Sequence, residues 1–202
     1  MTDAVAVLDE LGIRRAHVAG LSAGGGIAQE LAARFHDRVA SLTLISTSPV
    51  DPAIDGLPGA EPRITRLFTE AAAEPDWSDP AAVVDHIVEG ERPYAGPGNF
   101  DEDRVRAIAA RVVGRTRNLP SAMTNHFVLA ARDEPPTSLA DLAGIPALVV
   151  HGTADPMFPL EHGRALADAI PGARILELVD VGHQLPPPHT WERLVAAMTT
   201  LR

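Results

Sequence analysis

Ser22 lies in the five-residue stretch Gly20-Leu21-Ser22-Ala23-Gly24, which has the pattern G-x-S-x-G. A serine hydroxyl is a poor nucleophile unless a neighbouring base accepts its proton and a third group orients that base. In a nucleophile elbow, the serine occupies a strained turn between a strand and a helix, and small neighbours let the two elements approach closely. The pattern therefore predicts nucleophilic chemistry at Ser22 if a base and an acid lie nearby.

The same stretch also fits a simple glycine-rich turn or a loop that cradles a phosphate. Phosphate-binding loops need G-K-[ST] after the glycines or the spacing G-x-G-x-x-G. Neither pattern is present around Ser22. The context therefore favours the elbow.

Two further residues have the types that would complete such a site. Asp155 follows the strand-like run PALVVH (146–151), and His183 follows the strand-like run at 173–179. Taken singly, the aspartate would more often be a turn or cap residue and the histidine a structural loop residue. Because parallel strands end at one edge of a sheet, where catalytic groups gather, we expect all three residues to meet there. Their chain order, Ser then Asp then His, is also the order that this elbow type uses.

Hydrophobic periodicity predicts the elements that must position these residues. Thr2 and Asp3 precede apolar positions at Val5, Leu8 and Leu11, with Gly12 following, which predicts an opening amphipathic helix. Apolar runs predict strands at 16–21, 39–45, 146–151 and 173–179. Between and after them, helices are expected from 23 with an apolar face of Ile27, Leu31 and Phe35, over 160–170, and after His189. This alternation is typical of an α/β fold with a parallel sheet flanked by helices.

The middle of the chain differs from its two ends in composition and in hydrophobic pattern. Between about 50 and 140 it is rich in proline, alanine and acidic residues, and helical patterns occur near 61–73, 80–89, 101–114 and 118–132. The segment 91–103 is a Gly/Pro-rich loop whose acidic end is suited to cap the next helix. We therefore expect one domain over 1–202 with a helical insertion over 50–140.

Composition narrows the class of protein. The chain has 202 residues and a formal net charge of -10, without a Lys/Arg-rich run, so we expect neither a nucleic-acid nor a membrane partner. There are no cysteines, which excludes disulfides and thiolate chemistry. No segment has the length of apolar sequence that a bilayer requires, and the first residues do not have the pattern of a secretory signal, so we expect a cytoplasmic protein.

With these motifs in place, the chain resembles the α/β-hydrolase superfamily. The matching pieces are GLSAGG around Ser22, HGTADPMFP around Asp155 and VGHQLPP around His183. Within the superfamily, the segment from HGTADPMFP to VGHQLPP, together with RTRNLPSAMTNHF, is similar to an esterase group that includes aclacinomycin methylesterase and non-haem haloperoxidase-like hydrolases.

The resemblance implies roles for individual residues. Ser22 would be the nucleophile, His183 the general base and then acid, and Asp155 the group that orients the imidazole. The helical insertion would form a lid over the site. The backbone N–H of Ala23 would be one oxyanion-hole donor. Substrate contacts are expected from Leu21, Met123, His126 and Phe127. Apolar residues at helical spacing are core by default, however, and a histidine on a helix is more often a packed or solvated structural residue.

The front of the chain departs from the family pattern. Further strands normally precede the elbow strand, and a loop after one of them donates the second oxyanion N–H. Here only a helix precedes the elbow strand, so we expect half an oxyanion hole and a truncated or incomplete hydrolase. The run HVAGL would then be an open sheet edge, through which copies of the chain would associate.

Several other residues were weighed for the site. Asp51, shortly after the strand at 39–45, is an alternative acid, but a turn role beside Pro49 and Pro52 is favoured. His151 is expected to be structural. The remaining histidines lack the spacing of metal ligands, so no metal and no cofactor is expected.

The leading hypothesis is a serine hydrolase that cleaves carboxylic esters of small molecules through an acyl-enzyme. Peroxide in place of water would give perhydrolase or haloperoxidase-like activity from the same residues, and hydrolysis of a carbon–carbon bond stays open. A hypothesis from another class is a catalytically impaired fragment that acts as a binding protein. The sequence does not specify which ester would be cleaved.

Overall fold

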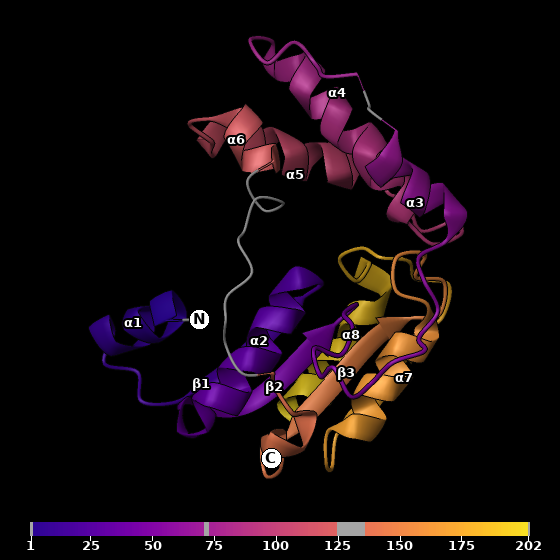
Figure 1. The fold of residues 1–202 in the computed structure, drawn as a ribbon. Coiled ribbons are helices and arrows are strands. Elements are labelled where there is room, and N and C mark those ends of the chain that lie inside the picture. The colour runs from indigo at the N-terminus through magenta and orange to yellow at the C-terminus, as the bar shows by residue number, and fades with distance from the viewer. Residues whose placement is uncertain (1, 71–72, 125–135, 202) are drawn as a thin grey trace.

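The computed structural model describes residues 2–70, 73–124 and 136–201 (Figure 1). Its sheet has four parallel strands in the order β1-β2-β3-β4. These strands are β1 (Ala16–Leu21), β2 (Val39–Ile45), β3 (Ala147–Gly152) and β4 (Arg174–Leu178). Each pair is parallel, so all four strands end at the same edge of the sheet. The predicted α/β class with a parallel sheet is confirmed.

Helices cover the two faces of the sheet unequally. On one face α2 (Ala23–Arg34) contacts β1 and β2, and α7 (Leu160–Ala169) contacts β3 and β4. On the other face α8 (Trp191–Thr199) packs on the region of β3. Strand β3 is buried along its whole length because both faces are covered. Strand β1 lies at the edge of the sheet, and its His17 and Ala19 are exposed.

Side-chain alternation along β3 divides the core into two clusters. Ala147 and Val149 pack with α2 and α7, where Leu31 and Leu166 are buried. Leu148 and Val150 pack on the opposite face with Leu178, Val181 and Leu194. The period of two along a strand therefore produces the two layers above and below the sheet.

Among the described residues, four α-helices lie between β2 and β3 in the sequence and gather beyond the carboxyl ends of the strands (Figure 1). They are α3 (Pro62–Thr69), α4 (Pro80–Glu91), α5 (Glu102–Arg115) and α6 (Leu119–Thr124). The side chains of Asp79 and Asp101 accept hydrogen bonds from the first turns of α4 and α5. The expected cap at the acidic end of the 91–103 segment is therefore present at Asp101.

Two predicted helix faces need correction. In α2, Leu31 is buried but Ile27 is 53% exposed, because the face that meets the sheet is formed by small residues, Ala28 and Ala32, beside Leu31. In the opening helix α1 (Thr2–Glu10), the expected face is half-buried at Val5 and Leu8, and Val5 packs against the core, but Leu11 just beyond the helix is 66% exposed. This helix lies beside the open edge of the sheet (Figure 1).

The bounds of the other predicted elements differ only at their ends. Strands β1 and β2 have the predicted limits, while β3 and β4 begin or end within one residue of them. The predicted helix at 118–132 is present as α6, and its remainder from 125 lies outside the described residues. No helix among the described residues is long and apolar enough to span a bilayer.

Candidate active site

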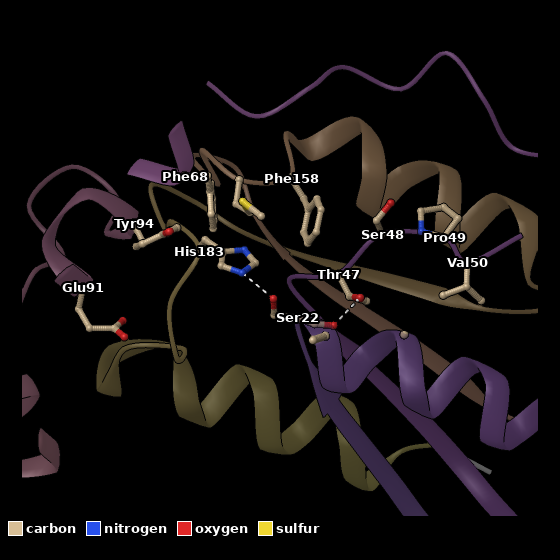
Figure 2. Close-up of a pocket in the computed structure, with 13 residues that line it drawn as sticks. Ser22, Thr47, Ser48, Pro49, Val50, Phe68, Glu91, Tyr94, Phe158 and His183 are labelled. Atoms are coloured by element: carbon tan, nitrogen blue, oxygen red, sulfur yellow. Dashed lines mark hydrogen bonds between the residues drawn. The ribbon is translucent and has the colours of Figure 1, made fainter. Parts of the chain in front are cut away.

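Ser22 occupies the turn between β1 and α2 with φ 51° and ψ -120°. A non-glycine residue at positive φ is uncommon and costs on the order of 1–3 kcal/mol, so it persists only where surrounding contacts hold it. The Ser22 N–H donates to the Ile45 carbonyl at 2.9 Å. The Ser22 carbonyl accepts from Gly25 N and from Thr47 Oγ1, each at 2.8 Å (Figure 2). These contacts fix the strained turn, and the hydroxyl points toward His183.

The glycines around Ser22 have different functions in the turn. A Cβ on Gly20 would overlap the carbonyl oxygen of Gly24, so this position needs glycine for the close approach of strand and helix. A Cβ on Gly25 would lie 2.6 Å from Thr47 Cβ. A Cβ on Gly24 would meet no atom within 4 Å. The first glycine of G-x-S-x-G is therefore required by packing, and the second is not.

His183 lies beside Ser22, on the loop after β4. Its Nε2 is 2.8 Å from Ser22 Oγ (Figure 2). The loop is anchored to the helical insertion, since the His183 N–H donates to the Tyr94 carbonyl at 2.8 Å. The rings of Phe158 and Tyr94 flank the imidazole at centroid distances of 5.4 and 6.1 Å.

Asp155, on the loop after β3, completes the row of three side chains. Its Oδ2 lies 2.9 Å from His183 Nδ1, and its Oδ1 accepts from the N–H groups of Met157 at 2.9 Å and Phe158 at 2.8 Å. The carboxylate is buried, and those two donors hold its orientation. A carboxylate at Nδ1 favours the imidazole tautomer with the proton on Nδ1, which leaves Nε2 to accept the Ser22 hydroxyl proton.

His151, which we expected to be structural, holds the loop after β3 that carries Asp155. It is fully buried, and its Nε2 binds the Phe158 carbonyl at 2.8 Å. Burial lowers the pKa of His151 below its usual range, with the carbonyl bond and the charge of Asp155 opposing that shift. A Cβ on Gly163 would lie 2.6 Å from the His151 ring, so helix α7 packs directly on the imidazole.

Two cavities meet at Ser22. The first has a volume of about 540 Å³, and the second, under the inserted helices, about 510 Å³. Ser22, Glu91 and His183 line both cavities. Each is large enough for a small organic ligand.

The expected oxyanion donor and the expected substrate residues line different cavities. Ala23 lines the first cavity, and Leu21 and Met123 line the second. Ala23 is also the first residue of α2, where backbone N–H groups have no partner within the helix. His126 and Phe127 lie outside the described residues.

Asp51, the alternative acid, is engaged elsewhere. Its carboxylate accepts from Ala53 N and from Leu139 N, each at 2.9 Å. These backbone hydrogen bonds lower the pKa of Asp51. Asp51 therefore ties the segment after β2 to the chain just before β3, while Asp155 is the carboxylate on His183.

Sequence reasoning missed three residues of the site, Glu91, Tyr94 and Phe158. Phe158 lies within the quoted motif HGTADPMFP, so its closeness to Asp155 was a usable signal. The sequence around Glu91 and Tyr94 predicts only a Gly/Pro-rich loop. In the structure, Glu91 is the last residue of α4, and Tyr94 ends the following 3-10 turn.

Comparison with known proteins places this geometry in a family. Residues 2–189 match the family described as alpha/beta hydrolase fold. The chain is 33% identical over 203 residues to rhodomycin D methylesterase DauP of Streptomyces sp. (strain C5), covering 92% of this chain and 66% of that protein. It is 32% identical to rhodomycin D methylesterase DnrP of Streptomyces peucetius, again covering 66% of the relative. The chain thus spans just under two thirds of the length of these relatives.

Solved structures share the same fold. The esterase RhEst1 from Rhodococcus sp. ECU1013 superposes with a TM-score of 0.70 at 22% identity, covering 99% of this chain and 71% of that one. The enol-lactonase from Burkholderia xenovorans LB400 has a TM-score of 0.61 at 28% identity, covering 98% of this chain and 68% of that one.

Proposed function

The chain belongs to the alpha/beta hydrolase family, and from that premise we propose that it is a serine hydrolase that cleaves carboxylic esters of small molecules. The observation that carries this proposal is the continuous hydrogen-bonded row from Ser22 Oγ through His183 to Asp155, with distances of 2.8 and 2.9 Å. The row lies at the carboxyl edge of a parallel sheet and opens into two cavities, as a site for small ligands does.

In the proposed reaction, Ser22 Oγ attacks the ester carbonyl while His183 Nε2 accepts the hydroxyl proton. Asp155 holds the imidazole in the required tautomer and stabilises the imidazolium that forms. His183 then returns the proton to the leaving alkoxide, and an acyl-enzyme remains on Ser22. A water molecule, deprotonated by His183, releases the acid and restores the serine.

The negative oxygen that develops on the carbonyl needs donors. The Ala23 N–H is the donor that we propose from this chain, since it begins a helix whose N-terminal end carries positive partial charge. Leu21 and Met123 would contact the substrate from the second cavity. Helices α3 to α6 would act as the lid that limits access of water to the acyl-enzyme.

The relatives support a substrate class. Two of them are named methylesterases, at 33% and 32% identity. We therefore propose a methyl or other small alkyl ester of a larger acid as the substrate.

A fluorophosphonate probe and intact-mass measurement test the proposal. One probe per chain is expected on the native protein and none on Ser22→Ala. The control concerns Ser48, which lines the first cavity and whose Oγ lies 2.9 Å from His162 Nδ1. His162 Nε2 binds the Pro58 carbonyl rather than a carboxylate, so this second pair lacks an ionised partner. Labelling that survives Ser22→Ala and vanishes in Ser48→Ala would overturn the assignment of Ser22 as the nucleophile. A folded native protein that takes no probe would favour the binding-protein hypothesis.

A further inference from the structure

We propose that the first cavity contains a subsite for an organic cation, such as a quaternary ammonium or a protonated amine, formed by Glu91 with the rings of Phe68, Tyr94 and Phe158. This inference rests on the proposed function, because the cation would be part of the ester that Ser22 attacks. It adds a substrate chemistry that the hydrolytic residues alone do not specify.

Glu91 supplies the charge of the subsite. Among the described residues that line the first cavity, Glu91 is the one with a formally charged side chain at neutral pH. In the second cavity, Asp101 and Arg104 offset each other, so Glu91 again leaves a net negative charge. An anionic group on a substrate would be repelled at the point where the two cavities meet, and a cationic group would be attracted.

The Glu91 carboxylate also has no protein partner within the described part of the chain. Its neighbours are paired: Arg92 Nη2 lies 2.8 Å from Glu89 Oε1 and 3.0 Å from Glu102 Oε2. Figure 2 shows the Glu91 side chain extending from the end of α4 toward the space beside Ser22 and His183. Partial desolvation raises the pKa of Glu91, and the charge of His183 opposes that shift.

Aromatic rings gather in the same cavity. The sequence contains five Phe, two Trp and one Tyr, and three of these eight residues line the first cavity. Figure 2 shows Phe68, Tyr94 and Phe158 around the His183 imidazole. Aromatic faces attract organic cations, and quaternary ammonium groups are bound in proteins by such clusters. Tyr94 interacts electrostatically with Glu91. Burial raises the pKa of the Tyr94 phenol, and the negative charge of Glu91 raises it further.

A purely structural explanation is that the rings only pack around the His183 imidazole, which Phe158 meets edge-on at 5.4 Å. That explanation predicts no preference between a cationic ester and an uncharged ester of the same shape. It also gives no reason for the charge of Glu91 at this cavity, since the Glu91 side chain makes no hydrogen bond or ion pair among the described residues. The two explanations therefore predict different ratios of kcat/KM for the cationic ester to kcat/KM for the uncharged ester.

The first experiment compares two methyl esters of equal size, methyl 4-(trimethylammonio)butanoate and methyl 5,5-dimethylhexanoate, in which carbon replaces the nitrogen. We expect kcat/KM to be higher for the cationic ester, and Glu91→Gln to lower the cationic-to-neutral ratio by roughly three- to tenfold. Glu89→Gln removes the same charge from the same helix at a residue outside both cavities, and it should leave the ratio unchanged. Equal ratios in the native protein and Glu91→Gln would overturn the subsite.

Phe68→Leu tests the aromatic contribution at a side chain that is 51% exposed, where the substitution leaves the buried core intact. The cationic-to-neutral ratio should fall again, with the thermal midpoint unchanged. A fall in activity toward both esters by the same factor would support packing around His183 instead.

A binding measurement separates the subsite from the proposed function. Choline and 3,3-dimethylbutan-1-ol are titrated calorimetrically into the Ser22→Ala protein and into Ser22→Ala combined with Glu91→Gln. Choline should bind more tightly than the alcohol, and the advantage should fall with Glu91→Gln. Choline preference without hydrolysis in the native protein would retain the subsite and overturn the hydrolase. Hydrolysis without choline preference would retain the hydrolase and overturn the subsite.

Discussion

Ser22 Oγ and His183 Nε2 lie 2.8 Å apart although 161 positions separate them in the sequence. Each is held by its own main-chain contacts: Ser22 by bonds to β2 and its adjoining loop, and His183 by its N–H bond to Tyr94. The pairing is thus prepared before any substrate arrives, which is the condition for a positioned base to act on a hydroxyl.

This pairing predicts strongly non-additive kinetics. Ser22→Ala and His183→Ala should each lower kcat for a p-nitrophenyl ester by about 10⁴- to 10⁶-fold, and the double variant by no more than either alone, because the two residues act as one unit. Steady-state rates of the three variants, with circular dichroism to check folding, test this. Independent, multiplying losses would contradict it.

Substitution of Asp155 should lower kcat strongly and the free energy of unfolding only modestly. Asp155→Asn keeps an acceptor for the Met157 and Phe158 N–H groups, but its amide favours the wrong imidazole tautomer. We expect kcat to fall by about 10³- to 10⁴-fold. Asp51→Asn, the matched control, should change stability rather than rate, because Asp51 binds Ala53 and Leu139 instead of His183.

The two glycines of G-x-S-x-G should respond differently to alanine. Gly20→Ala should destabilise the protein by about 3 kcal/mol or more, because its Cβ would overlap the Gly24 carbonyl in a rigid turn. Gly24→Ala has free space and replaces glycine within helix α2, so it should be neutral or stabilise by up to about 1 kcal/mol. Urea unfolding of both variants measures the difference, and equal midpoints would refute the packing argument.

The burial of His151 should make the free energy of unfolding depend on pH. Its pKa in the folded protein is lowered by burial, so the unfolded chain binds a proton that the folded chain resists. The resulting stability is complete above about pH 6.5, the ordinary histidine value, and is lost as pH falls, by at most about 1.4 kcal/mol per pH unit. Urea unfolding at pH 7.5 and 5.5 should show a smaller decrease for His151→Gln than for the native protein. Identical decreases would assign the effect to other groups.

The exposed edge of β1 predicts self-association. Strand β1 ends the sheet with His17 and Ala19 exposed, and an unpaired edge is a template for pairing with another strand. Sedimentation should show a dimer or larger species that dissociates in Ala19→Lys, since charge on an edge strand opposes pairing. A native protein that stays monomeric at high micromolar concentration would contradict this prediction.

Local sequence patterns were sufficient to predict the strands and the proximity of Ser22, Asp155 and His183. The runs at 16–21 and 39–45 are apolar and end at turn residues, so burial on a sheet determines their limits. Ser22, Asp155 and His183 could be placed together because parallel strands share one edge. The apolar face of α2 could not be predicted from large residues alone, because the sheet accepts Ala28 and Ala32 and leaves Ile27 exposed.

The cavities were decided by tertiary structure. Glu91 and Tyr94 are separated from Ser22 by an inserted segment without strand periodicity, and their local sequence reads as a loop. They reach the site because α4 and the following turn fold back over the sheet edge, where the Tyr94 carbonyl binds His183 N–H. The sequence by itself determined the fold class and the meeting of Ser22, Asp155 and His183 at one sheet edge, through local periodicity and motif. Only packing of the insertion against the sheet determined what surrounds them, because those contacts join residues with no regular spacing along the chain.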